Sequence, residues 1–174
     1  MKLFIANLNQ IINRRDFISA QIPELNLSDS KRAKKIKNEQ RLLQFLVGRL
    51  LLLEYLHTDF QTLESGKVVA DNIFVSLAHS DYFVVLAIDD KPIGVDIEKI
   101  DETRDFKKIA NRLKFKNCQT AQDFTKSFTA YEADFKLGKE HNHPKHQFFE
   151  RDGFIICVSS LTRKKIELIE KNLL

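Results

Sequence analysis

The stretch from Lys91 to Ile100, KPIGVDIEKI, constrains the fold more than any other part of the sequence. Successive side chains on a β-strand point to opposite faces, so its residues divide into two sets. One face is apolar and needs a core to cover it: Ile93, Val95 and Ile97. The other face carries Gly94, Asp96 and Glu98. The stretch therefore predicts a strand with one buried face and one face that presents two carboxylates.

The two carboxylates of this strand can be interpreted in two ways. Two residues span roughly 6–7 Å along a strand, a spacing that allows two oxygen ligands to converge on one hard cation. Gly94 adds no side chain to their face and leaves room for another group to approach. The alternative is an edge strand with two solvated acids, because Asp and Glu are common at protein surfaces. The strand alone does not decide between them.

Composition indicates a soluble protein of one domain, or of two small halves that share a core. The 174 residues are 43% hydrophobic and include 14 Phe, enough for a sizeable core. The net charge is 28 − 24 = +4, which suits an anionic ligand, an acidic partner or nucleic acid. Two distant cysteines, Cys118 and Cys157, favour a reducing cytoplasm over a disulfide framework. We expect neither a signal peptide nor a membrane span, since Arg49 and Glu54 interrupt the longest apolar run.

Hydrophobic periodicity and turn residues predict a mixed order of helices and strands. Strands are expected at residues 2–6, 73–78, 82–88, 93–100, 147–150, 154–159 and 165–169. Helices are expected at 28–37, with Ser28 or Ser30 as the N-cap, and at 39–57, 106–114 and 120–137. Because helices precede antiparallel strands in both halves, we expect two similar lobes, residues 1–98 and 99–174, each a small antiparallel sheet packed with helices.

The predicted helix 120–137 contains a second group of charged residues. Four aromatic residues recur at helical spacing and are expected in the core: Phe124, Phe128, Tyr131 and Phe135. Glu132 and Lys136 lie on the shoulder of that stripe, about 40° and 80° from Phe128 at 100° per residue. They are either an ordinary surface ion pair worth about 0.3–0.5 kcal/mol or a carboxylate and a cation that reach the pocket of Asp96 and Glu98.

The two stretches together resemble the signature of the 4′-phosphopantetheinyl transferases. The motif reads Gly94-Val95-Asp96-Ile97-Glu98 and then Phe128-Thr129-Ala130-Tyr131-Glu132-Ala133-Asp134-Phe135-Lys136, with a gap of 132 − 96 = 36 between Asp and Glu. Further stretches are similar to the larger, Sfp-type branch: Phe74–Ile88, Ser65-Gly66-Lys67, and Arg41 ahead of Phe45–Arg49. The chain departs from the family where it has Tyr131, Ala78 and Val68 in place of the usual Lys, Ser and Pro.

The resemblance implies an enzyme of the holo-acyl-carrier-protein synthase type. Such enzymes move the 4′-phosphopantetheine group of coenzyme A to a serine of an acyl or peptidyl carrier protein and release 3′,5′-ADP. By the same resemblance, Mg²⁺ (or Mn²⁺) is the cofactor, and three carboxylates bind it: Asp96, Glu98 and Glu132. Glu132 is then the general base, and Lys136 holds a pyrophosphate oxygen. The resemblance assigns the remaining contacts with coenzyme A to Arg41, Lys67 and His79.

The family also implies an oligomeric state, a cellular location and partners. The Sfp-type branch is a monomer whose two lobes form a pseudo-dimer around the active site, so a cytoplasmic monomer is expected. Its carrier protein serves fatty-acid synthesis or a specialised polyketide or peptide pathway. Nucleic acid and membrane are not expected partners. Two alternatives stay open: a catalytically silent relative that only binds coenzyme A or carrier protein, and a basic nucleic-acid-binding α+β module.

Two further clusters invite functional interpretations. Three histidines, His141, His143 and His146, are close enough in sequence to bind zinc, although Pro144 and polar neighbours are typical of an exposed loop. The basic run from Lys31 to Lys37 is a candidate nucleic-acid patch, but it lacks interleaved aromatics. A solvated helix face, which could receive coenzyme A or an acidic carrier protein, is the simpler interpretation.

Overall fold

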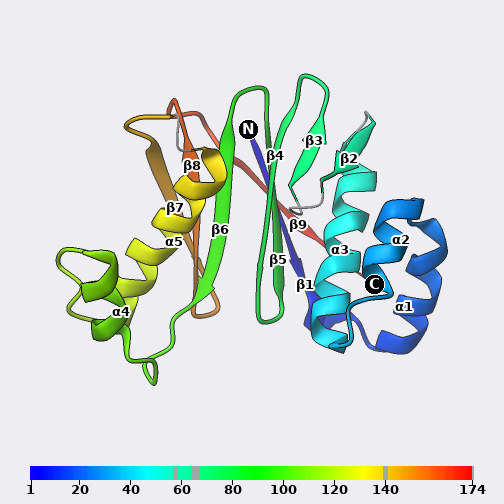
Figure 1. The fold of residues 1–174 in the computed structure, drawn as a ribbon, viewed down its shortest axis with the longest axis horizontal. Coiled ribbons are helices and arrows are strands. Elements are labelled where there is room, and N and C mark those ends of the chain that lie inside the picture. The colour runs from blue at the N-terminus through cyan, green and yellow to red at the C-terminus, as the bar shows by residue number, and fades with distance from the viewer. Residues whose placement is uncertain (57–58, 64–66, 139–140, 174) are drawn as a thin grey trace.

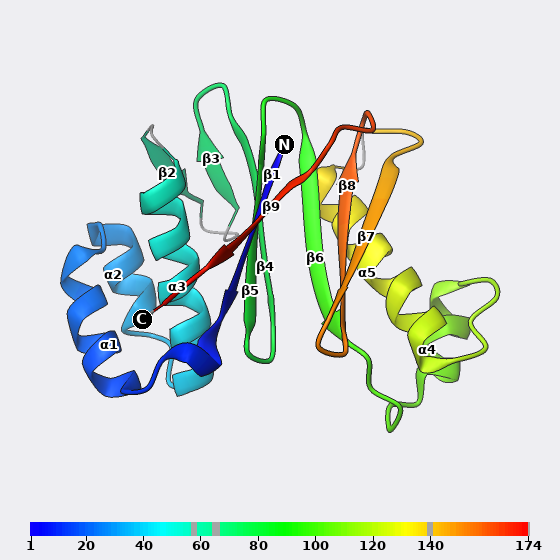
Figure 2. The ribbon, with the colours of Figure 1, turned by 180° about the vertical axis from the view of Figure 1, so that it is seen from behind.

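The fold is a stack of helices and two central sheets (Figures 1 and 2). The computed structural model describes residues 1–56, 59–63, 67–138 and 141–173. The α-helices of this part are α1 (Arg14–Gln21), α2 (Leu27–Ala33), α3 (Glu39–Tyr55), α4 (Phe106–Leu113) and α5 (Ala121–Leu137). Two short 3₁₀ helices, η1 (Leu8–Gln10) and η2 (Ile22–Glu24), flank α1. The α+β class expected from the sequence is confirmed.

The strands form two principal sheets and one small hairpin. The first sheet has the order β4 (Phe74–Ser80), β5 (Phe83–Asp89), β1 (Lys2–Asn7) and β9 (Glu167–Lys171). The second has the order β6 (Ile93–Lys99), β8 (Phe154–Ser160) and β7 (Lys145–Arg151). The hairpin pairs β2 (Phe60–Thr62) with β3 (Val68–Ala70). All of these pairings are antiparallel except β1 with β9, which is parallel.

The two principal sheets pack face to face, and helices cover their outer faces (Figure 1). Side chains of both sheets meet in one apolar core: Leu3, Ile5, Val85, Ala87, Ile93, Val95, Ile97, Ile156 and Val158. The opposite face of the first sheet packs against α3 through Phe4, Val84 and Leu86. The apolar face predicted for residues 93–97 is therefore confirmed, and it is buried against the first sheet.

Helix α3 covers the first sheet because its apolar side chains and one glycine fit that face. Asn38 caps its first turn by accepting a hydrogen bond from the Arg41 amide. Leu43, Val47 and Leu51 are fully buried. The helix begins at Glu39 as predicted and ends at Tyr55, with Leu56 as its C-cap, whereas the predicted helix ran to residue 57, which lies outside the described residues.

Helix α5 covers the second sheet with a face of mostly small residues rather than with the expected aromatic stripe. Thr120 and Asp123 form a capping box at its start. Its buried residues are Ala121, Phe124, Thr125, Thr129, Ala133 and Leu137. Tyr131 and Phe135 are 46% and 58% exposed, so their predicted place in the core is wrong. The helix lies so close to β6 that only small side chains fit between them.

Other departures from the sequence expectations lie in the N-terminal half and in the course of the chain. The N-cap of α2 is Asn26, not Ser28 or Ser30, because its side chain accepts from the Asp29 amide. Helix α1 and the β2–β3 hairpin were not expected. The division at residue 98 stays a prediction, but the sheets cross it: β6 belongs to the second sheet, and β9 returns to the first.

No helix in the described part has both the length and the apolar character needed to cross a bilayer.

Candidate functional site

Strand β6 presents Asp96 and Glu98 toward α5. Asp96 is 6% exposed, and Glu98 is partly buried. The alternative of two solvated acids on an edge strand therefore does not describe Asp96. The group that approaches Gly94, as the sequence predicted, is the backbone of α5. A Cβ atom at position 94 would lie 1.9 Å from the Ala133 carbonyl oxygen and 2.7 Å from the Leu137 amide nitrogen.

This close approach brings the charged end of α5 to β6. Lys136 Nζ lies 2.7 Å from Asp96 Oδ1 and donates to the Val95 carbonyl oxygen at 3.1 Å. The other carboxylate oxygen, Asp96 Oδ2, is buried and has no hydrogen-bond partner among the described residues. A buried acceptor without a partner is costly, and a cation at this oxygen would offset that cost.

The three predicted carboxylates lie within electrostatic range of one another. Burial raises the pKa of Asp96 against the opposing effect of Lys136, and the charge of Glu132 raises it further. Burial, followed by the charge of Asp96, raises the pKa of Glu98 to about 7. The pKa of a carboxyl group rises in this way when its charge is poorly solvated and lies near other negative charges. A bound cation would favour the ionised forms.

These residues fit a hard divalent cation that keeps much of its water shell. Among the described residues, no group of three His, Cys, Asp or Glu side chains is close enough to form a ready metal cage. Mg²⁺ does not require one, since it is commonly held by one or two carboxylates together with waters and substrate phosphates. The unpartnered Oδ2 of Asp96 would supply a first oxygen ligand, and Glu98 stands two residues along the same face of β6.

His79 and Arg41 lie on the first-sheet side of the same site. Partial desolvation, and then the positive charges of Lys136 and Arg41, lower the pKa of His79. The turn after His79 is hydrogen-bonded to α3, because Gln44 Nε2 donates to the Asp81 carbonyl oxygen at 2.7 Å. This contact holds His79, at the end of β4, near Arg41 in the first turn of α3. The predicted cations of the N-terminal half are thus neighbours of the predicted carboxylate site.

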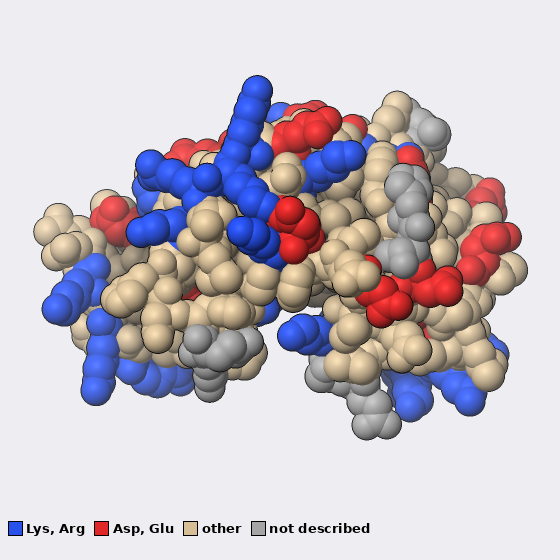
Figure 3. Space-filling view, turned by 90° about the horizontal axis from the view of Figure 1, so that it is seen from above, with Lys and Arg blue, Asp and Glu red and all other residues tan. Residues whose placement is uncertain are grey.

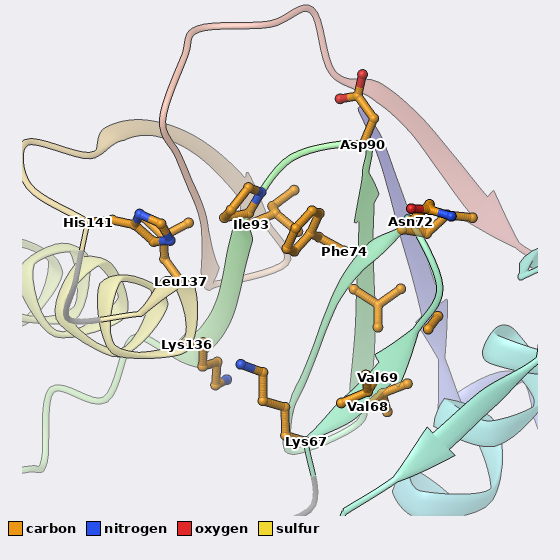
Figure 4. Close-up of a pocket in the computed structure, with 14 residues that line it drawn as sticks. Lys67, Val68, Val69, Asn72, Phe74, Asp90, Ile93, Lys136, Leu137 and His141 are labelled. Atoms are coloured by element: carbon orange, nitrogen blue, oxygen red, sulfur yellow. The ribbon is translucent and has the colours of Figure 1, made fainter.

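Lys67 reaches the site across a pocket of about 440 Å³. Figure 4 shows the Lys67 and Lys136 side chains directed toward one another. Lys67 directly precedes β3, and Lys136 belongs to α5. Apolar side chains that include Phe74, Ile93 and Leu137 line the rest. Two facing ammonium groups favour an anion between them. Ser65 and Gly66, the other residues of the predicted glycine–lysine loop, lie outside the described residues.

Sequence reasoning missed Arg104, which faces the site from the loop before α4. The positive charge of Arg104 opposes the rise in the Glu98 pKa. Its guanidinium lies 5.6 Å from the Phe124 ring centroid and 5.5 Å from that of Phe128. These contacts hold the Arg104 side chain against α5. A single arginine in an irregular loop gives no periodic signal in a sequence.

A second missed group fixes the orientation of α5. Asp134 Oδ1 accepts a hydrogen bond from the buried Ser159 hydroxyl at 2.5 Å and lies 2.8 Å from His146 Nε2. Asp134 stands between Glu132 and Lys136 in the sequence, so its contacts to β8 and β7 hold the helix turn that carries both. His146 is therefore engaged here, and His141, His143 and His146 do not gather into a metal site within the described part of the chain.

The mild net charge is distributed unevenly. Seen from above, lysine and arginine side chains gather over the side of the molecule that holds the β6–β8–β7 sheet (Figure 3). Acidic side chains are interspersed, and more of them lie on the opposite half of this face. The basic surface thus lies on the half of the molecule that carries Asp96 and Glu132, where it favours an acidic partner.

Comparison with known proteins gives one informative match. The chain is 32% identical over 97 residues to the 4′-phosphopantetheinyl transferase gsp of Aneurinibacillus migulanus. The match covers 50% of this chain and 40% of the relative. No protein-family model matches. The chain thus spans less than half the length of this relative, and half of the chain is similar to part of a 4′-phosphopantetheinyl transferase.

Proposed function

We propose that the chain transfers the 4′-phosphopantetheine group of coenzyme A to a serine of an apo acyl or peptidyl carrier protein, with Mg²⁺ as the cofactor. The observation that carries the proposal is the buried, unpartnered Oδ2 of Asp96, which lies beside Lys136 and within electrostatic range of two more carboxylates. The match to a 4′-phosphopantetheinyl transferase supports the same chemistry.

The proposed site would hold Mg²⁺ with one or two of the carboxylates of Asp96, Glu98 and Glu132, together with waters and the phosphates of coenzyme A. When bound, the ion supplies positive charge that neutralises the phosphates and the leaving group. Lys136 exchanges its contact with Asp96 for a pyrophosphate oxygen, which it holds as a point charge. Arg41, Lys67 and His79 contact the other phosphates of coenzyme A.

Glu132 is the proposed general base for the carrier serine. It accepts the hydroxyl proton as the serine oxygen attacks the β-phosphorus next to the pantetheine, and the pyrophosphate bond breaks to release 3′,5′-ADP. A general base must lie within hydrogen-bond reach of the proton that it accepts, so the carrier serine would have to enter beside Glu132.

The proposed arrangement is that of the Sfp-type branch. Residues 1–98 and 99–174 form two lobes of one monomeric, cytoplasmic chain, and the site lies where they meet. The layered order of helix, sheet, sheet and helix supports a pseudo-dimer of this kind. The positive surface over the second sheet suits an acidic carrier protein.

The test is the release of 3′,5′-ADP from coenzyme A in the presence of Mg²⁺ and several apo carrier proteins. We expect release that requires a carrier and falls at least about a hundredfold in Glu132→Gln, as for the loss of a general base. Glu102→Gln, a matched change at an exposed glutamate, should retain full activity. Binding of coenzyme A without release of 3′,5′-ADP would favour the silent relative. The absence of both binding and release would overturn the proposal.

A further inference from the structure

Strands β4 and β6 lie next to one another although they belong to different sheets (Figure 1). Among the described strands, β4 pairs with β5, β6 pairs with β8, and no backbone ladder joins β4 to β6. Each is therefore an edge strand, and the N–H and C=O groups on its free edge need other partners. The partners of β6 bear on the candidate site, because Asp96 and Glu98 belong to this strand.

At Val95, two side chains supply the partners that the free edge of β6 needs. The Val95 amide donates to the Ser76 hydroxyl of β4 at 2.9 Å, and the Val95 carbonyl oxygen accepts from Lys136 Nζ at 3.1 Å. In an antiparallel pair the N–H and C=O of one residue point to the same side, so both groups of Val95 face away from β8. Val95 is fully buried and Ser76 is 8% exposed, so the bond between them is shielded from water.

The hydroxyl of Ser76 has a purpose other than filling space. Ala78, two residues along the same face of β4, is 3% exposed and packs in the core between the sheets. That face thus accepts a side chain without a polar group, whereas a buried hydroxyl is costly unless it forms a hydrogen bond. The bond to Val95 offsets that cost, and it adds a direction that the apolar contacts between the sheets lack.

The direction matters because Val95 also helps to hold Lys136. The Lys136 ammonium contacts both the Val95 carbonyl oxygen and Asp96 Oδ1, which is 2.7 Å away. Ser76 therefore fixes, from the first sheet, the residue that supplies one of these two acceptors. The same bond links β4, which carries His79, to β6, which carries Asp96, and so constrains how the two parts of the site lie relative to one another.

We propose that Ser76 is a positioning residue, whose hydroxyl holds Val95 so that Lys136 is placed for the pyrophosphate of coenzyme A. This inference rests on the proposed function. Ser76 acts through Val95 and Lys136 and not by touching a substrate. Because Lys136 contacts coenzyme A and not the carrier protein, loss of the hydroxyl should impair the use of coenzyme A selectively.

The first test examines Val95 and Lys136 in the full chain without any substrate. In Ser76→Ala, hydrogen–deuterium exchange of the Val95 amide should be about fivefold to tenfold faster, as expected for the loss of one hydrogen bond. Acetylation of Lys136 by an N-hydroxysuccinimide ester, followed by peptide mass spectrometry, should also be faster. The Glu98 amide, which points toward β8, should keep its protection. Unchanged exchange at Val95 would overturn the proposal.

The second test measures transfer at varied concentrations of coenzyme A and of carrier protein. Ser76→Ala should raise the KM for coenzyme A about threefold to tenfold and leave the KM for the carrier unchanged within about twofold. Ser76→Thr retains a hydroxyl and should restore the original KM. Ser76→Cys keeps the size of serine but offers only a weak acceptor, so it should behave like Ser76→Ala and decides if the alanine variant does not fold. The control is Ser160→Ala, which removes another buried hydroxyl, one that donates to the Thr162 carbonyl oxygen, and should leave both KM values unchanged.

The outcomes separate this inference from the proposed function. An equal rise of both KM values in Ser76→Ala, or the same effect in Ser160→Ala, would show that Ser76 acts through general stability and would overturn the inference. Absence of transfer in the unaltered chain would instead overturn the proposed function. Faster Val95 exchange and Lys136 acetylation in Ser76→Ala would in that case still support the hold of Ser76 on Lys136.

Discussion

At the scale of single residues, Gly94 determines whether the site exists. It allows the α5 backbone to approach β6 so closely that Lys136 reaches Asp96. The sequence correctly indicated that something approaches Gly94, but it could not indicate that the helix itself does. The contact depends on the relative placement of elements 40 residues apart in the chain, which local periodicity does not encode.

Gly94→Ala should disrupt the site and destabilise the fold. Its Cβ would meet backbone atoms of Ala133 and Leu137, which cannot move without displacing the helix, so we expect a loss of roughly 3 kcal/mol in unfolding free energy. Gly48→Ala is the matched control, because its Cβ would meet the flexible end of the Leu77 side chain at 3.0 Å. Urea unfolding measures both, and equal effects would contradict the close-approach account.

Glu98 should make stability depend on pH. Its pKa is raised from 4.5 to about 7 in the folded chain, so the folded state binds the proton more tightly than the unfolded state. The resulting penalty is absent below about pH 4.5, grows as pH rises to about 7, and is complete above it. Glu98→Gln should therefore stabilise the protein at pH 8, by roughly 2 kcal/mol, and have little effect at pH 4.5.

Urea unfolding at pH 4.5 and pH 8 checks this prediction. Glu102→Gln, at an exposed position, serves as the control and should show no such pH dependence. A stabilisation by Glu98→Gln that is the same at both pH values would show that hydrophobic contact, and not ionisation, is responsible.

At the scale of elements, helix α5 is the part whose orientation matters most. The sequence predicted its extent almost completely, since residues 120–137 were expected and Ala121–Leu137 is observed. The face that it buries was predicted wrongly, because Tyr131 and Phe135 were assumed to seek the core. Close packing against Gly94 favours Thr129 and Ala133 there instead. The spacing of hydrophobic residues alone does not show how closely two elements pack.

Ser159→Ala should loosen α5 on the second sheet. The change removes the hydrogen bond from the buried Ser159 hydroxyl to Asp134, at an expected cost of about 1 kcal/mol. The amides of α5 should then exchange with deuterium faster, and phosphopantetheine transfer should slow because Glu132 and Lys136 are held less firmly. Ser160→Ala removes a bond to the Thr162 carbonyl oxygen instead and should leave α5 exchange unchanged.

At the scale of the whole molecule, the fold class could be predicted from the sequence, but the order of the strands in the sheets could not. The parallel pairing of β9 with β1, from opposite ends of the chain, has no local signal, and neither does the assignment of β6 to the second sheet. The candidate site was predictable in its residue types because the motif with Asp96, Glu98, Glu132 and Lys136 resembles a family. Arg104 and the Asp134–Ser159–His146 group were not, because they act through contacts that only the folded chain creates.

The central claim is that Asp96 belongs to a Mg²⁺-dependent phosphopantetheine-transfer site. The most direct measurement is the intact mass of an apo acyl carrier protein after incubation with the purified chain, coenzyme A and Mg²⁺. We predict a mass gain of one phosphopantetheine group that is lost with EDTA and in Asp96→Asn, but is retained in the exposed variant Asp71→Asn. The same gain in Asp96→Asn, or in EDTA, would contradict the account.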